Sequence, residues 1–210
     1  MQYFENNRAA LFGRAETDYS FSHEVFGERF YRMTLAVTRS SGRTDHLPVV
    51  VSERLTDVCL PVRGCCVLVT GQFRSLYRTQ GDKRLLLLFI FARSIDVQAA
   101  EGGPAFCPIN ELKAEGLLYK PACLRETADG RMLSTFILAS GRAYMKTDYL
   151  PCVCWGRNAI YLASLKAGAR LRLEGRIQSR QVDRGRRGKR VLYEVSVTGA
   201  ACLSEREAGA

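Results

Sequence analysis

The chain has 210 residues, 47% of them hydrophobic, and its 31 Lys and Arg against 21 Asp and Glu give a formal net charge of +10. This apolar content argues against a disordered chain, and the lack of any run of 18 apolar residues argues against a membrane-spanning helix. The positive balance favours a polyanionic partner, although net charge says nothing about the fold.

The sequence contains a long internal repeat. Residues 44–48, Thr-Asp-His-Leu-Pro, return 103 residues later as Thr-Asp-Tyr-Leu-Pro at 147–151. The same offset relates six further identities between the two halves: Asn7, Gly13, Gly27, Leu35, Ala36 and Arg39 recur as Asn110, Gly116, Gly130, Leu138, Ala139 and Arg142. One additional residue in the second copy changes the offset to 104, which relates another three pairs: Gly64, Gly71 and Ser75 to Gly168, Gly175 and Ser179.

A period near 100 residues is the size of one small domain and is too long for a solenoid repeat. The sequence therefore predicts a duplicated domain. We place a divergent N-terminal copy at residues 1–98, a Gly- and Ala-rich linker at 99–107, a C-terminal copy at 108–203 and a short tail at 204–210.

In the first copy, apolar and β-prone runs predict a long irregular strand within residues 7–21 and further strands at 29–39, 47–52, 65–77 and 84–97. A turn is expected near Gly27 and a short helical turn around residues 56–60. The run Leu-Leu-Leu-Leu-Phe-Ile-Phe-Ala at 85–92 is typical of a strand covered on both faces, which a subunit contact would explain.

In the second copy, the turn at Ala128-Asp129-Gly130 precedes a strand at 131–142. Residues 147–155 alternate, with Leu150, Cys152 and Cys154 on one face and Tyr149, Val153 and Trp155 on the other. A short helix at 158–165 and strands at 170–180 and 191–197 follow. The predicted fold is all-β, with two tandem five-stranded barrels that each carry a short helix between strands 3 and 4, which is the plan of the OB-fold.

Eight cysteines are present, without the spacing of a zinc site and with only His23 and His46 to supply imidazole. The N-terminus lacks the apolar core of a secretory signal, so we expect a reducing compartment and no disulfides. The cysteines are expected to be mostly small buried hydrophobes. No metal or other cofactor is predicted.

The positive charge is concentrated near the C-terminus. Residues 170–190 hold nine cations against Glu174 and Asp183, a local net charge of +7. Such a run can be a solvated hairpin kept for solubility or a surface for a polyanion. Its strand–turn–strand pattern favours a nucleic-acid interface with these candidates: Arg170, Arg172, Arg176, Arg180, Arg184, Arg186, Arg187, Lys189 and Arg190.

The second copy resembles the bacterial single-stranded DNA-binding protein family over about residues 110–203. Four blocks carry the resemblance: LSTFILA at 133–139 with Arg142, TDYLPCVCWGR at 147–157, KAG at 166–168 and LEGRIQSR at 173–180. The first copy resembles the family only through the second. Two barrels in one chain resemble the dimeric, tandem-barrel members.

The resemblance implies single-strand binding, which needs cations along the phosphates and aromatic faces for stacked bases. Tyr149 and Trp155 match the family's stacking positions, with burial of Trp155 at a subunit contact as the alternative. Tyr144 either stacks on a base or covers the barrel mouth. Further candidates in this copy are Arg142, Lys146 and Arg157.

At the corresponding positions of the first copy, His46 replaces Tyr149 and Ser52 replaces Trp155. We therefore expect a strong second barrel and a weaker or structural first one. The candidates in the first copy are Arg39, Arg74, Tyr77, Arg78 and Lys83.

Gly185–Arg190 resembles a phosphate-binding loop only superficially, and no catalytic cluster is evident, so an enzyme is not expected. The expected function is largely sequence-independent binding and protection of single-stranded DNA, or of RNA, in replication, recombination or repair. A primosome-type or RNA-handling OB protein and a structural assembly module remain as alternatives. A homodimer with four barrels is expected, in the cytoplasm with the nucleoid. The last ten residues contain no acidic tip to recruit partner proteins.

Overall fold

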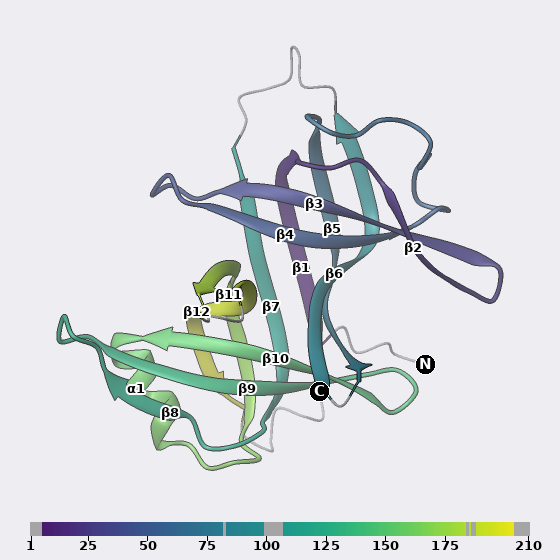
Figure 1. The fold of residues 1–210 in the computed structure, drawn as a ribbon. Helices are drawn as coiled ribbons and strands as arrows, with labels where there is room; N and C mark the ends of the chain where they lie inside the picture. Colours follow the sequence, from purple (N-terminus) through teal and green to yellow (C-terminus); the bar gives the residue numbers. More distant parts are fainter. Residues whose placement is uncertain (1–5, 82, 99–106, 184, 186–187, 204–210) are drawn as a thin grey trace. The chain divides into compact units, whose positions relative to one another are not determined.

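The computed structural model describes residues 6–81, 83–98, 107–183, 185 and 188–203 (Figure 1). This part of the chain contains twelve strands and one helix. Most of the predicted linker, the predicted tail and three candidate cations lie outside it: Arg184, Arg186 and Arg187. The helix α1 has nine residues, and no helix among the described residues is long and apolar enough to cross a membrane.

The first copy forms a closed barrel. Its strands are β1 (Asn7–Ala15), β2 (Ser20–Val25), β3 (Glu28–Thr38), β4 (Thr44–Ser52), β5 (Cys66–Gln80) and β6 (Lys83–Gln98). Strand β1 pairs with both β5 and β3, and β4 pairs in parallel with β6. The pair Arg14↔Ala36 closes the barrel between β1 and β3. Strand β2 is an additional short strand that extends the sheet beyond β3.

The second copy repeats this topology. Its elements are β7 (Ile109–Leu118), β8 (Cys123–Glu126), β9 (Met132–Arg142), β10 (Lys146–Trp155), α1 (Gly156–Ser164), β11 (Arg170–Asp183) and β12 (Lys189–Cys202). The closing pair Leu117↔Ala139 is the repeat equivalent of Arg14↔Ala36. Strands β10 and β12 are parallel, as β4 and β6 are. In each copy the five main strands close in the order of an OB-fold, which confirms the predicted fold class.

Four of the recurring glycines lie where the backbone of another strand is in close contact. A Cβ atom on Gly13 would lie 2.4 Å from the Ala36 carbonyl oxygen, and one on Gly116 would lie 2.4 Å from that of Ala139. A second recurring pair, Gly71 and Gly175, meets the strands that follow at similar distances. Only a residue without Cβ fits at such contacts, so the duplicated glycines mark duplicated backbone crossings.

Each barrel is filled from the alternating faces of its strands. Leu150, Cys152 and Cys154 of β10 are buried, and Trp155 at its end is 41% exposed. Leu171, Leu173 and Ile177 of β11 are also buried, as the alternation of that strand predicts. In β6 one face is buried, whereas Leu87 on the other face is 36% exposed within the chain.

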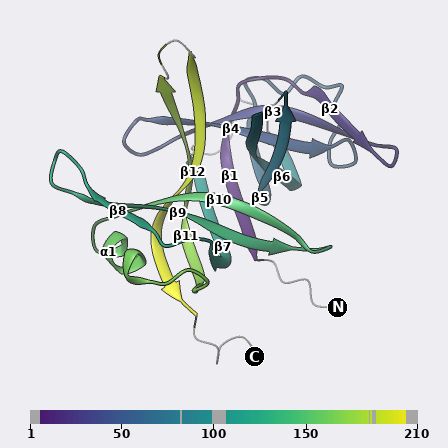
Figure 2. The ribbon, with the colours of Figure 1, turned by 60° about the horizontal axis from the view of Figure 1, so that its bottom comes forward.

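The helix predicted between strands 3 and 4 is present only in the second copy. Helix α1 packs against β8, β9 and β10 and buries Ala159 and Leu162 (Figure 2). In the first copy, residues 53–64 form turns, so the helical turn predicted around residues 56–60 is wrong. Pro61 and the β-branched residues before it disfavour a helix there. The segment is held instead by Asp18, whose carboxylate accepts hydrogen bonds from the backbone N–H groups of Val62 (2.8 Å) and Arg63 (2.9 Å).

The prediction for the cysteines is wrong for most of them. Only Cys152 and Cys154 are buried, whereas four of the others are exposed: Cys59, Cys107, Cys123 and Cys202. Burial raises the pKa of the thiols of Cys152 and Cys154. The exposed cysteines lie on turns, strand ends and an edge strand, where sequence position does not report burial.

The chain separates into two compact units that are not contiguous in sequence. One contains Leu112–Ile177 and the segment from Tyr193 onward, and the other contains Ala9–Glu111 and Gln178–Leu192. The outer part of the β11–β12 hairpin, although it belongs to the second copy in sequence, is therefore part of the unit of the first barrel.

Candidate nucleic-acid interface

The outer face of β10 carries two aromatic side chains. Strand alternation directs Tyr149 and Trp155 away from the buried Leu150 and Cys154. Trp155 is 41% exposed, so its ring is at the surface of the chain. Tyr149 is half-buried and meets the ring of Tyr119 edge-on, with 5.2 Å between the ring centroids. The exposed part of the Trp155 ring offers a surface on which a flat ligand can stack.

A cation accompanies Trp155. The guanidinium of Arg131 lies 4.8 Å from the centroid of the indole ring. Asp129 holds this guanidinium through a 2.5 Å hydrogen bond from Arg131 Nε and itself accepts a 2.6 Å bond from the Thr127 hydroxyl. These bonds, first that from Thr127 and then that from Arg131, lower the pKa of the Asp129 carboxyl. Sequence reasoning missed Arg131 and Tyr119, because neither lies in the strand that carries the aromatic pattern.

A shallow pocket of about 340 Å³ continues this face. Its lining is mostly apolar and includes one lysine and one glutamate, from these residues among others: Lys120, Thr135, Ile137, Pro151, Val153 and Glu194. Lys120 Nζ also lies 5.7 Å from the centroid of the Tyr119 ring. The outer face of the second barrel thus combines rings, an apolar hollow and cations.

The tip of the β9–β10 hairpin projects into solvent. Tyr144 is 91% exposed and Met145 is fully exposed. Both residues have positive φ, 60° and 54°, a conformation that side chains other than glycine rarely adopt. Tyr144 therefore does not cover the barrel mouth, and Lys146 beside it is also exposed.

The cations of β11 and β12 have several environments. Arg170 and Arg172 share the carboxylate of Glu115, at 3.8 Å and 2.7 Å, and remain 40% and 55% exposed. Arg176 and Arg190 are half-buried, whereas Arg180 and Lys189 are exposed. Arg157 of α1 is also exposed. Exposed ion pairs of this kind are weak, so they leave the arginines able to bind another anion.

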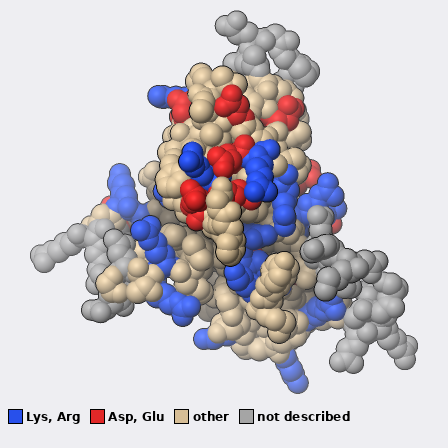
Figure 3. Space-filling view, turned by 90° about the vertical axis from the view of Figure 1, so that its right-hand side faces the viewer, with Lys and Arg blue, Asp and Glu red and all other residues tan. Residues whose placement is uncertain are grey.

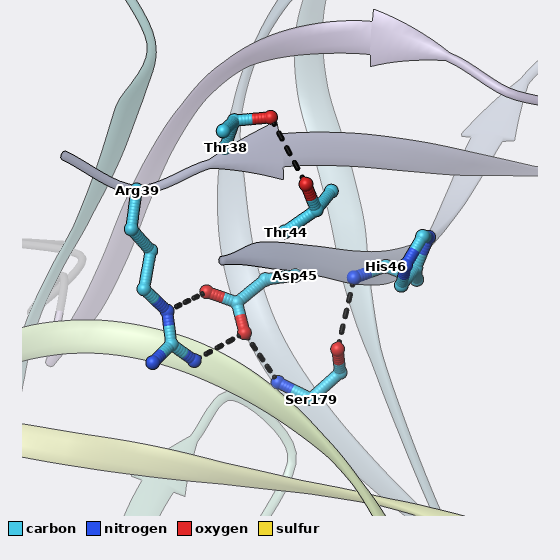
Figure 4. A network of polar contacts seen from close by, with 6 residues as sticks. All are labelled: Thr38, Arg39, Thr44, Asp45, His46 and Ser179. Carbon is cyan, nitrogen blue, oxygen red and sulfur yellow. Dashed lines mark hydrogen bonds and ion pairs between the residues drawn. The ribbon is translucent and has the colours of Figure 1, made fainter. Parts of the chain in front are cut away.

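The predicted cation Arg39 has a buried partner, Asp45 (Figure 4). Arg39 donates two hydrogen bonds to Asp45, at 2.6 Å and 2.5 Å, and the Asp45 side chain has no exposed surface. Asp45 also accepts a 2.8 Å bond from the backbone N–H of Ser179, and the N–H of His46 donates to the Ser179 hydroxyl at 2.9 Å. Arg39 is only 16% exposed, so its charge neutralises the buried Asp45 and contributes little to the surface.

The same pair recurs in the second copy. Arg142 Nε lies 3.5 Å from Asp148, whose side chain is 5% exposed. This pair has the repeat positions of Arg39 and Asp45, so the recurrence of Arg and of Thr-Asp in the sequence corresponds to a recurrent internal ion pair. Neither arginine has the environment of the exposed cations of β11.

The stacking positions of the first barrel are occupied differently. His46 is exposed, and its Nδ1 lies 2.8 Å from the carboxylate of Glu16. Ser52 is buried and donates a 2.5 Å hydrogen bond to Glu28. Neither position offers an unengaged aromatic ring, and the weaker first barrel stays a prediction.

The other candidates of the first copy lie on β5 and β6. Arg74 donates hydrogen bonds to Gln72, the shorter at 2.6 Å. Tyr77 is 42% exposed and has the guanidinium of Arg84 4.2 Å from its ring centroid. Arg78 is exposed, and Lys83 begins β6, with its side chain outside the described part of the structure. In the space-filling view of one face, Lys and Arg are widely spread, whereas Asp and Glu gather mostly in the upper half (Figure 3).

Two closed OB barrels, one of them with an aromatic and cationic outer face, define a tandem OB-fold protein. A model of the single-strand binding protein family matches residues 109–202. The single-stranded DNA-binding protein of Bacillus cereus is 34% identical over 109 residues, 48% of this chain and 64% of that protein. Single-stranded DNA-binding protein 3 of Streptococcus agalactiae is 33% identical over 106 residues, 47% of this chain and 76% of that protein.

The chain belongs to the single-strand binding protein family, as the sequence blocks of the second copy predict. It spans less than two thirds of the length of the Bacillus relatives. The crystal structure of the wild-type single-stranded DNA binding protein from Thermus aquaticus matches with a TM-score of 0.76 and 20% identity, over 95% of this chain and 93% of that one. This likeness extends the shared fold over both copies.

Proposed function

We propose that this protein binds single-stranded DNA without catalysis and with little sequence preference. One observation carries the proposal: Trp155 is exposed on the outer face of the second barrel with Arg131 beside its ring. Membership of the single-strand binding protein family supports it. Binding of this kind protects single strands during replication, recombination or repair, which would place the protein with the nucleoid in the cytoplasm.

The proposed mechanism combines stacking with phosphate neutralisation. Bases stack on Trp155, Tyr149 and Tyr144, and every base offers a π-face, so the interaction tolerates any sequence. Arg170, whose side chain is 40% exposed, follows the phosphates together with the exposed cations Lys146, Arg157, Arg172, Arg180 and Lys189. Residues 108–203 contain 17 Lys and Arg against 8 Asp and Glu, whereas residues 1–98 contain 13 against 10. Six of these 17 cations lie within Gln178–Leu192, which belongs to the unit of the first barrel, so the second barrel is proposed as the main stacking surface because of Trp155 and Tyr149 and not because of its charge.

Trp155 is the one tryptophan of the chain, so its fluorescence reports directly on the proposed site. We expect an oligothymidylate to quench this fluorescence, with duplex DNA of the same length a much weaker competitor. The log–log dependence of affinity on salt should have a slope of about −0.7 per phosphate neutralised. Equally tight duplex binding or a flat salt response would overturn the proposal.

Substitutions test the roles of the rings. Tyr149→Ala and Trp155→Ala should each weaken binding of a fluorescent oligonucleotide by about 1–3 kcal/mol per lost base contact. His46→Ala, at the repeat position of Tyr149, is the matched control and should have little effect. Tighter binding of RNA in the competition would favour the RNA-handling alternative, and absence of any nucleic-acid binding would favour an assembly module.

We further propose a homodimer that presents four barrels. Leu76 of β5 and Leu87 of β6 lie directly opposite each other and are 52% and 36% exposed, so they form an apolar pair on the outer face of the first barrel. Burial of that pair would stabilise a dimer through the hydrophobic effect. Light scattering should give twice 23.5 kDa at micromolar concentration. A mass of 23.5 kDa throughout would refute the dimer.

A further inference from the structure

The outer face of the first barrel carries a cluster of rings and guanidinium groups outside the predicted stacking positions. The ring of His23 lies nearly parallel to that of Phe30, with 4.9 Å between centroids and 10° between planes. Phe30 in turn lies 5.8 Å from Phe91. The guanidinium groups of Arg74 and Arg93 lie 4.6 Å and 5.8 Å from the centroid of Phe91. We call these five residues the β3–β6 ring cluster.

Strand register shows how this cluster relates to the site on the second barrel. In the second barrel, Trp155 of β10 lies opposite Leu133 of β9. At the equivalent pair of the first barrel, Ser52 of β4 lies opposite Phe30 of β3. The aromatic residue of this pair is therefore on β10 in the second barrel and on β3 in the first. A comparison of Trp155 with Ser52 alone shows only that the first copy lacks the tryptophan.

The neighbouring strand adds a second ring. Val50 of β4 pairs with Phe91 of β6, as Val153 of β10 pairs with Ser196 of β12. Phe91 thus replaces a serine at the position beside the central valine. Val50 itself is 4% exposed, because the surrounding side chains cover it. The first barrel consequently has two phenylalanines on its outer face where the second has an aliphatic residue and a serine.

Exposure and charge favour a polyanionic, ring-bearing ligand over an apolar one. Phe30 is 8% exposed and lies beneath His23, which is exposed, while Phe91 is partly exposed. Arg93 is exposed, and so is Arg32, which lies opposite Val50 on the same face. The nearby carboxylate of Glu28 is engaged by Arg54 at 3.5 Å and by Ser52. Rings beside several arginines are the combination that single-strand binding uses.

We propose that the β3–β6 ring cluster is a second nucleobase-stacking site, in which bases stack on Phe91 and His23 while Arg32, Arg74 and Arg93 contact the phosphates. This inference rests on the proposed single-strand binding. It makes the first barrel a binding surface with rings on different strands from those of the second. A second copy of the chain on the same face is the competing occupant, and the experiment distinguishes the two.

The test uses the full chain with single Phe91→Leu, Phe91→Tyr and Phe21→Leu changes. Phe91→Leu removes the ring but keeps apolar volume, whereas Phe91→Tyr keeps the ring. Phe21 is 58% exposed and meets Tyr31 edge-on. Tyr31 follows Phe30 in β3 and therefore points to the opposite face of that strand, so the same change at Phe21 is the matched control. We expect Phe91→Leu to weaken binding of an oligothymidylate that is long enough to span two barrels by about fivefold or more. Phe91→Tyr and Phe21→Leu should bind as the unchanged chain does.

A residue-resolved measurement accompanies the titration. An oligonucleotide with 5-iodouracil crosslinks to aromatic side chains on which its bases stack, and mass spectrometry of the digested complex locates the crosslinks. We expect crosslinked peptides that contain Phe91 or His23, lost in Phe91→Leu and retained in Phe21→Leu. Thermal unfolding of each variant establishes that it is folded.

Each outcome decides the inference. If the unchanged chain binds no single-stranded oligonucleotide, the proposed function and the second site are both wrong. If it binds, but Phe91→Leu has full affinity and crosslinks map only to the second barrel, the second site alone is wrong. If Phe91→Leu instead converts a dimer to a monomer and crosslinks never reach Phe91, the cluster is a subunit contact rather than a nucleic-acid site.

Discussion

Replacement of Gly116 by alanine should open the second barrel at its closing pair of strands. The added Cβ would lie 2.4 Å from the carbonyl oxygen and 2.8 Å from the carbonyl carbon of Ala139. Both atoms belong to the backbone of β9, which cannot rotate away as a flexible side chain can. Overpacking costs about 1–3 kcal/mol, and a backbone obstacle places Gly116→Ala at the upper end of that range.

A loss of about 3 kcal/mol should lower the unfolding midpoint by about 12–24 °C in a domain of this size. Circular dichroism and Trp155 fluorescence measure it. Gly141→Ala is the matched control, since a Cβ there meets nothing within 4 Å, and its stability should change by about 0.5–1 kcal/mol at most. Ala139 lies opposite Tyr149, so opening this pair should also weaken DNA binding as temperature rises. Equal stability of Gly116→Ala and the unchanged chain would refute the assignment of Gly116 to a backbone crossing.

Asp45→Asn should destabilise the chain by about 2 kcal/mol, which is less than the loss of a fully buried ion pair because Arg39 keeps 16% exposure. The change should also speed hydrogen exchange at the Ser179 amide, which donates to Asp45. Urea unfolding measures the first effect and exchange mass spectrometry the second, and an unchanged exchange rate would contradict the role of Asp45. Arg131→Ala should weaken single-strand binding by about two- to fivefold through loss of its contact with Trp155, measured by oligonucleotide anisotropy, with full affinity counting against that contact. Maleimide should label the native chain at pH 8 only at accessible thiols. Cys152 and Cys154 should stay unlabelled, because burial hides their thiols and raises the pKa of each, which keeps them protonated. Rapid labelling of these two cysteines in the native chain would show that they are not buried.

Much of the fold follows from short-range pattern. The alternation of Leu150, Cys152 and Cys154 with Tyr149 and Trp155 predicts which face of β10 is buried, since a strand directs successive side chains to opposite sides. The repeat predicts two copies of one barrel, and the family blocks of the second copy lead to the single-strand binding protein family. These features depend on residues close together in the chain or on comparison between equivalent positions.

Features that depend on pairing between strands required the tertiary structure. The sequence predicts Arg39 and Arg142 as surface cations, but each lies against a buried aspartate of the next strand. The helical turn expected in the first copy is replaced by turns held through Asp18, which is more than forty residues away from its partners in the chain. A pattern of neighbouring residues in the sequence cannot predict partners that are so distant in the chain.

The proposed stacking surfaces divide in the same way. Tyr149 and Trp155 could be predicted because they share one strand, where a separation of six residues places two side chains on the same face. Arg131 beside Trp155, and Phe30 and Phe91 on the first barrel, come together only through register between strands. Sequence alone therefore determined the two barrels, their alternating faces and the aromatic strand of the second barrel. Tertiary structure decided which cations face solvent and where the first barrel carries its rings, because those side chains come into contact only through hydrogen-bonded pairing of distant strands.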